Sequence, residues 1–168
     1  MRHFYWILLS CGVIGGLVIA GEKAQTASAT VGAHTTELPD YDRIRIYALS
    51  GAPFRGNEGF PILPYDGAVC KIVDEVEVSG KQADAICKLW RTLNDEPNQA
   101  MCHSPPYGFR FYRGEKMEYE TSMCWKCNNY YGPNDAGKQI WYGLKKDKQS
   151  ATLLKLCKKL LPHPDVKN

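Results

Sequence analysis

Histidine and the familiar motifs of enzyme catalysis are scarce in this chain. Only four of its 168 residues are histidine, and His103 alone falls within the body of the expected domain. The sequence contains no Gly-x-Ser-x-Gly elbow, no His-Glu-x-x-His zinc motif, no phosphate-binding loop and no dinucleotide fingerprint. These absences exclude the enzyme classes that depend on those motifs, and we expect a protein that is not an enzyme and holds no cofactor.

A large excess of charge of either sign is also missing. The 21 basic and 18 acidic residues leave a formal net charge of +3. This near-balance argues against a dedicated nucleic-acid binder. The charge is unevenly spread, because residues 138–168 carry eight lysines against two aspartates. The C-terminal end is therefore a basic patch.

One long apolar run is present, and it lies at the N-terminus. A basic residue precedes the apolar stretch over 4–20, and small residues follow it, which is the layout of an export signal. Cleavage fits after Ala20 or, as we favour, after Ala29. The alternatives are an uncleaved membrane anchor and a lipoprotein lipidated at Cys11. We expect a periplasmic or secreted protein with no membrane span after cleavage, or a membrane-tethered one if either alternative holds.

The remaining pattern predicts one α+β domain. We expect an export signal over 1–29, a flexible linker over 30–40, the domain over 41–163 and a tail over 164–168. Alternating apolar and polar residues predict an antiparallel sheet of about five strands. These strands are expected near 43–48, 70–78, 107–112, 117–123 and 139–144. Two helices pack on the sheet, which gives the order ββαβββα.

Capping signals and helical spacing locate the two predicted helices. Ser79 and Gln82 have the spacing of a capping box, and an apolar stripe from Ile86 to Leu93 follows them. Ser150 is expected to cap the second helix, which Pro162 stops. Between the first two strands, residues 50–68 read as a long loop, with either a plain structural role or a binding role.

Six cysteines remain once Cys11 is set aside with the leader. An even number in an exported chain favours disulfides, with Cys70, Cys87 and Cys157 expected at buried positions of a strand and the two helices. The other candidates are Cys102, Cys124 and Cys127. Pairing Tyr112 with Met117 across the hairpin turn runs Tyr107 alongside about Ser122. This register leaves Cys102 near Cys127.

Three interpretations fit the cluster of Cys102, His103, Cys124 and Cys127. The first is a structural disulfide from Cys102 to Cys124 or Cys127. The second is a zinc site with three cysteine ligands and one histidine ligand, although Cys124 to Cys127 lacks the glycine usual in such a knuckle. The third is thiol redox chemistry at Cys124 and Cys127, with Lys126 lowering a thiol pKa.

A pattern across this cluster resembles a group of small exported bacterial proteins with no assigned activity. The matching residues are Cys102-x-x-Pro105, the Phe111-Tyr112 pair and Cys124-Trp125-x-Cys127. The resemblance covers about 26 residues of the chain. It implies an exported bacterial domain and carries over no catalytic residue.

Aromatic side chains suggest how such a domain binds a partner. Tyrosine and tryptophan often anchor interfaces, and several crowd the end of the hairpin or lie in the long loop. The candidate partner-binding residues are Trp125, Tyr130, Tyr131, Trp141, Phe54 and Phe60. We expect a disulfide-stapled module that binds an envelope protein, as an inhibitor or toxin-immunity protein does. The alternative is a cysteine-centred zinc or redox site.

Overall fold

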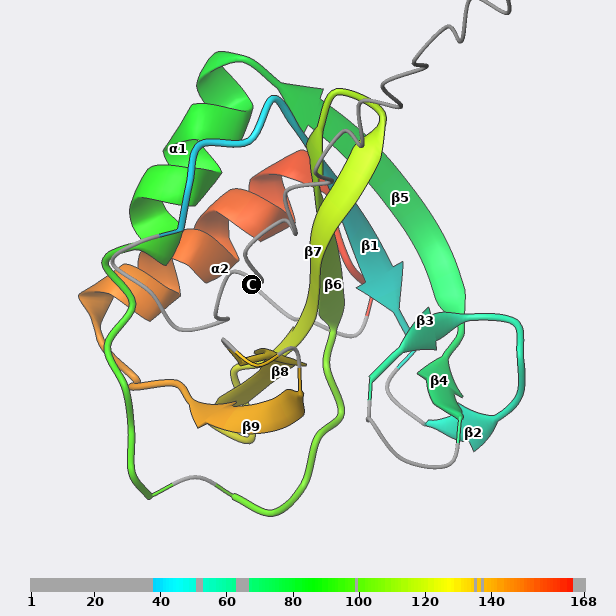
Figure 1. Cartoon of the computed structure of the whole chain (residues 1–168). Coiled ribbons are helices and arrows are strands. Elements are labelled where there is room, and N and C mark those ends of the chain that lie inside the picture. The colour runs from blue at the N-terminus through cyan, green and yellow to red at the C-terminus, as the bar shows by residue number, and fades with distance from the viewer. Residues whose placement is uncertain are drawn as a thin grey trace, which may run out of the picture.

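The computed structural model describes residues 38–50, 53–62, 67–98, 100–134, 136 and 138–164. Within them the chain forms nine strands and two helices (Figure 1). The first strands are β1 (Arg43–Leu49), β2 (Phe54–Arg55), β3 (Phe60–Pro61), β4 (Ala68–Cys70) and β5 (Ile72–Ser79). After helix α1 (Lys81–Trp90) come β6 (Tyr107–Arg113), β7 (Lys116–Cys124), β8 (Asn129–Pro133), β9 (Gln139–Gly143) and helix α2 (Lys148–Leu160).

The strands form one large and one small antiparallel sheet. The six-stranded main sheet has the order β5-β1-β6-β7-β8-β9, and the small sheet has the order β2-β4-β3. Both helices cover the same face of the main sheet, which we call the inner face (Figure 1). The α+β class is therefore confirmed, whereas the predicted strand count and strand order were wrong.

Two regions account for the extra strands. The segment expected as a loop over 50–68 contains the short strands of the small sheet, and β4 continues that sheet up to Cys70. Strand β8 lies between the strands predicted near 117–123 and 139–144, where no strand was predicted. Its composition, Asn-Tyr-Tyr-Gly-Pro, is poor in the β-branched residues that favour strands, but pairing on both sides with β7 and β9 overrides that preference.

A bulge interrupts the long second strand that the sequence predicted. Ala48 pairs with Asp74, but the next residue, Leu49, pairs with Ile72, so the register shifts between them. The shift places Ile72 against the small sheet, while Val76 and Val78 face the helices. The polar interruption at Asp74 was the only sequence signal of this change of face.

The helix starts also differ from the prediction. Helix α1 follows Gly80, whose positive φ of 52° turns the chain out of β5, and no side chain caps it, so the predicted Ser79–Gln82 capping box was wrong. Helix α2 is capped by Asp147, and Ser150 completes a reciprocal capping box three residues later. Ser150 therefore stabilises the start of α2 from inside the helix.

Trp90 lies at the centre of the core between the helices and the inner face. Its indole makes edge contacts with four aromatic rings, those of Phe109, Phe111, Tyr119 and Tyr130. Apolar side chains of β1, β5 and both helices complete the cluster. Burial of so many rings on one face stiffens the sheet and leaves its other face, the outer face, to carry polar side chains.

No helix in the described ranges is long and apolar enough to cross a membrane. The predicted export signal and most of the predicted linker lie outside the described residues.

Candidate functional site

The predicted cysteine cluster contains one disulfide. Tyr112 pairs with Met117 as predicted, and a register shift after Phe111 places Tyr107 opposite Met123, one residue beyond Ser122. The hairpin brings Cys102 and Cys127 together, and the structure joins them as a disulfide with 5.9 Å between their Cα atoms. The bond fixes the segment before β6 to the turn that connects β7 and β8.

The other four candidate cysteines are buried thiols: Cys70, Cys87, Cys124 and Cys157. Burial raises the pKa of the Cys70 thiol to about 11 and raises the pKa values of Cys87 and Cys157. The Sγ of Cys124 donates to the carbonyl of Ser104 at 3.3 Å and accepts from the backbone amide of Cys127 at 3.3 Å. These thiols therefore behave as packed core groups.

His103 connects the disulfide segment to the sheet through a buried polar network. Its Nδ1 lies 2.7 Å from Oδ1 of Asn129, and its Nε2 lies 2.8 Å from Oγ of Ser122. The ring also meets the edge of Trp141, with 5.0 Å between centroids. Because no charged group touches the ring and burial disfavours the cation, the pKa of His103 is lowered to about 4.

The serine, histidine and asparagine of this network are connected in the order of a catalytic triad. Ser122, however, is only 1% exposed and lies in the middle of β7, paired with both β6 and β8. A nucleophile must be reachable by its substrate, and this hydroxyl lies in the interior. The network therefore serves to hold segment 100–104 onto the outer face.

The same contacts bear on the zinc and redox interpretations. Cys102 and Cys127 bond to each other, and both ring nitrogens of His103 have hydrogen-bond partners. In the described part of the chain, no group of three or more His, Cys, Asp or Glu side chains is placed to hold a metal ion. The pairing of Cys127 with Cys102 also leaves Cys124 without the partner that a Cys-x-x-Cys redox pair requires.

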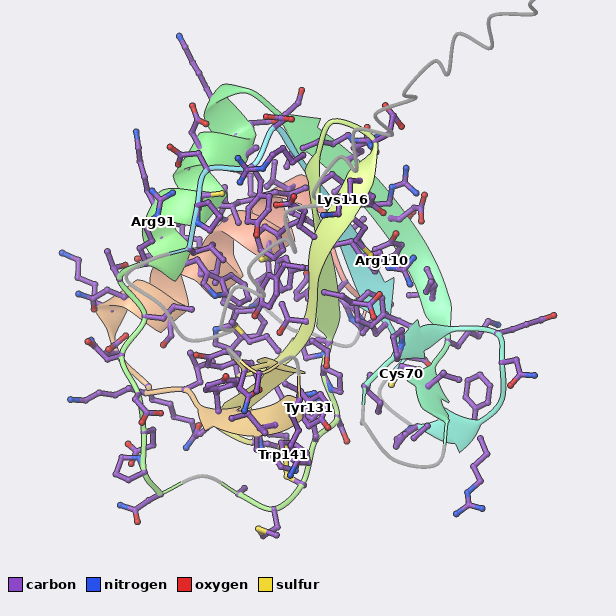
Figure 2. All side chains as sticks on the ribbon, in the orientation of Figure 1. Cys70, Arg91, Arg110, Lys116, Tyr131 and Trp141 are labelled. Atoms are coloured by element: carbon purple, nitrogen blue, oxygen red, sulfur yellow. A yellow bond between two sulfur atoms is a disulfide. The ribbon has the colours of Figure 1, made fainter. Side chains whose placement is uncertain are left out.

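Three of the candidate aromatic residues lie in the interior. Tyr130 packs in the main core, stacked on Tyr142 with 5.1 Å between the ring centroids. Tyr131 is buried beside Trp141, and Figure 2 shows these two rings together at one end of the molecule. Phe60 is buried under the small sheet, against Tyr47.

The other three candidate aromatic residues retain exposed surface. Trp125 is half-buried, and its Nε1 donates to the carbonyl of Ser150 at 2.8 Å, so it braces the start of α2. Trp141 is half-buried beside His103. Phe54, in the small sheet, is 44% exposed and lines a cavity of about 370 Å³ together with Glu58, Gly59, Lys71 and Ile72.

The outer face carries a row of charged residues that sequence reasoning did not single out. The row crosses four neighbouring strands in register: Glu77 on β5, Arg45 on β1, Arg110 on β6 and Glu120 on β7. Each arginine bonds the glutamate beside it, Arg45 at 2.9 Å and Arg110 at 2.6 Å. We call these four residues the charged row. Figure 2 places Arg110 on the side of the sheet away from the helices.

Tyrosine rings flank the charged row. The guanidinium of Arg110 lies 5.0 Å from the ring centroid of Tyr47 and donates to its hydroxyl at 3.2 Å. On the other side, Arg43 lies 4.6 Å above the ring of Tyr112. The alternation that predicted β1 does place Arg43 and Arg45 outward, but the register that sets Arg45 beside Arg110 depends on pairing between distant strands.

No protein-family model, no curated protein and no solved structure matches this chain. Its function therefore has to be inferred from its own residues.

Proposed function

We propose that this chain is an exported, disulfide-stapled module that binds a protein of the bacterial envelope, in the manner of an inhibitor or toxin-immunity protein. The observation that carries the proposal is the charged row on the outer face, with the partly exposed Tyr112 beside it. Arginine and tyrosine are among the residues that contribute most to binding at protein interfaces.

The two central arginines favour an acidic group on the partner. Arg45 and Arg110 stand directly opposite each other on adjacent strands, an arrangement that costs stability when like charges face one another. Glu77 and Glu120 offset this repulsion from the two ends of the row. A partner carboxylate placed between the guanidiniums would meet both of them, and arginine is suited to hold a carboxylate with two hydrogen bonds.

The structure around the row supports a rigid binding surface. Phe60 and the small sheet pack over Tyr47 at one end of the outer face, and the disulfide segment with His103 packs over Ser122. Of the aromatic residues predicted to bind, Phe54 has the exposed ring and the adjoining cavity. We place the edge of the interface there, because an exposed aromatic beside a cavity accepts an apolar side chain of a partner.

The compartment in the proposal rests on the predicted export signal together with the cysteines. Disulfides persist outside the reducing cytoplasm, and the Cys102–Cys127 bond is consistent with that location. The four buried thiols are compatible with it as well, because thiols closed off in a core are slow to react.

The experiment that tests the proposal is capture of the partner by defined surface variants. The chain is immobilised and exposed to an envelope extract of its own organism, and the retained proteins are identified by mass spectrometry. The R45A/R110A and F54A variants are compared with the wild type. K88A serves as the matched control, because Lys88 is exposed on α1, which covers the inner face.

We expect one protein to be retained by the wild type and by K88A, to be lost from R45A/R110A and to be weakened by F54A. Double truncation at an interface centre typically weakens binding by about 100-fold or more. Hydrogen exchange with the purified partner should then protect β1 and β6. Retention that is equal across all variants contradicts a role for the outer face, and circular dichroism confirms that each variant is folded.

A further inference from the structure

Helix α2 presents a row of lysines directly away from the core. At 100° per residue, Lys148, Lys155 and Lys159 fall within about 40° of one another around the helix axis. All three are exposed, and the buried residues Leu153 and Cys157 lie on the opposite side of the same helix. We call these three residues the lysine row.

The positive charge of this surface is not balanced within the helix. Helix α2 contains four lysines and no acidic residue, and Lys145 and Lys146 are exposed just before it. The adjacent acid, Asp147, is occupied as the helix cap, where it accepts from the backbone amide of Ser150 and from Asn94. Among the described residues, no acidic side chain forms an ion pair with a member of the lysine row.

Two features of the row lower helix stability. Lys148 is the first residue of α2, at the positive end of the helix dipole. Lys155 and Lys159 are four residues apart, so their like charges repel along one face. Lys159 lies in the last turn, where its charge is favourable to the helix dipole, but this does not remove the other two effects. An anionic surface placed against the row would relieve both of them.

We propose that the lysine row binds the surface of an anionic lipid bilayer. The row is straight and extends over 12 of the 13 residues of the helix, or about 17 Å, so its ammonium groups can meet a flat array of head groups together. No aromatic residue occurs in α2 to stack on nucleic-acid bases, which disfavours single-stranded nucleic acid as the occupant.

The path of the chain brings the N-terminal segment to the same layer of the fold. Leu38, the first described residue, is buried in the core with residues of α1, and its carbonyl accepts from Arg91 at the end of that helix. Figure 1 shows the segment before β1 running along α1, and α1 packs against α2. The chain therefore enters the domain at the helical layer, to which α2 also belongs.

This placement matters for the membrane-tethered forms that the sequence allows. Seventeen residues, 21–37, separate the apolar run from Leu38. A chain of 17 residues reaches at most roughly 60 Å when fully extended. A retained signal would keep the domain within that reach of the bilayer, and a lipidated Cys11 would connect to it through residues 12–37. In either form a basic surface can act as the second signal that stable attachment requires.

The test is sedimentation of the full chain with lipid vesicles. One set of vesicles is phosphatidylcholine alone, and the other contains roughly 30 mol% phosphatidylglycerol. We expect an apolar run over 4–20 to add binding to both kinds of vesicle, so the measured quantity is the ratio of the two partition coefficients. The test variant is K148E/K155E/K159E. The control, K71E/K116E/K126E, changes net charge equally at exposed lysines outside both helices.

We expect the wild-type ratio to favour the anionic vesicles and to fall on the order of 100-fold in the lysine-row variant. The control variant should lose no more than a few-fold. The preference should also decline between about 0.1 M and about 0.5 M NaCl, because salt screens head-group attraction. An equal loss in both variants, or no loss in either, overturns the proposal. The proposal is also overturned if the chain binds a short DNA duplex through the lysine row and shows no preference for anionic vesicles.

Discussion

Asn129 holds His103 in one tautomer. The amide nitrogen of Asn129 donates to the carbonyls of Ala100 and Cys102, each at 2.8 Å, so its oxygen is the atom that faces His103. Nδ1 of the imidazole must then carry the proton and donate to that oxygen at 2.7 Å. Nε2 is left to accept from the Ser122 hydroxyl. All three polar side chains are thereby satisfied with the imidazole neutral.

Because the fold holds this imidazole neutral, we expect the protein to lose stability in mild acid. His103 has a folded-state pKa of about 4, below the unfolded value near 6.5, so the unfolded chain binds the proton more tightly. The neutral imidazole makes its full contribution to the free energy of unfolding above about pH 6.5. That free energy should fall by roughly 3 kcal/mol as the pH is lowered toward 4. Urea unfolding measured at a series of pH values tests this.

Other groups titrate in the same range, so the comparison needs a matched variant. H103Q keeps a polar side chain at the site and removes the titration. The difference in unfolding free energy between wild type and H103Q should shrink as the pH falls from 7 to 4. A constant difference across that range would show that His103 is not held neutral by the fold.

The network also predicts unequal costs for its two partners. Truncation at Asn129 removes three buried hydrogen bonds and leaves two carbonyls and Nδ1 unpaired, so N129A should lose about 3 kcal/mol or more. S122A removes one hydrogen bond and should lose about 1 to 2 kcal/mol. Chemical denaturation measures both, and S122A more costly than N129A would contradict the described network.

The hairpin that assembles this site was predictable, and the network within it was not. Alternation between Tyr107 and Met123 gave two strands, the turn gave their pairing, and that pairing placed Cys102 near Cys127. The alternation includes Ser122 but does not identify its partner, and Asn129 belongs to no periodic pattern. Both residues act through contacts that form only after β8 pairs with β7. The periodicity of apolar residues in one sequence indicates which face of an element is buried. It contains little information about which polar residues, distant in sequence, become hydrogen-bond partners.

The same limit explains the error at α1. Ser79 and Gln82 have the correct spacing for a capping box, but Gly80 adopts a positive φ and its carbonyl becomes the first acceptor, from the amide of Asp84. That turn is set by the need to bring the helix back over the inner face. At α2 the predicted cap, Ser150, was wrong by three residues, because Asp147 is the N-cap and Ser150 completes the capping box from inside the helix.

The disulfide predicts a stability difference between the oxidised and reduced chain. Cys102 and Cys127 are 25 residues apart, and closing a loop of that length stabilises a fold by about 3 kcal/mol through the unfolded state. The C102S/C127S variant should therefore have a free energy of unfolding lower by that amount, and its urea midpoint should be lower as well. Reduction should lower the stability of the wild type and leave the variant unchanged.

Thiol labelling distinguishes this framework from one with three disulfides. We expect peptide mapping to find one cross-link, between Cys102 and Cys127. Four cysteines of the described chain should resist alkylation in the native state and react after denaturation, since all four are buried. A second cross-link, or fast native labelling of Cys124, would contradict the arrangement described above.

Gly108 sets how closely the small sheet packs on the main sheet. A Cβ at this position would lie 2.6 Å from Cζ of Phe60, and Phe60 is fully buried against Tyr47, so its ring has little room to move. G108A should therefore cost about 1 to 3 kcal/mol by overpacking, although alanine suits a strand better than glycine. F60L removes the clashing ring atoms and should recover part of that loss in the double variant. A double-mutant cycle by chemical denaturation measures the coupling, and additive losses would show that the two residues do not touch.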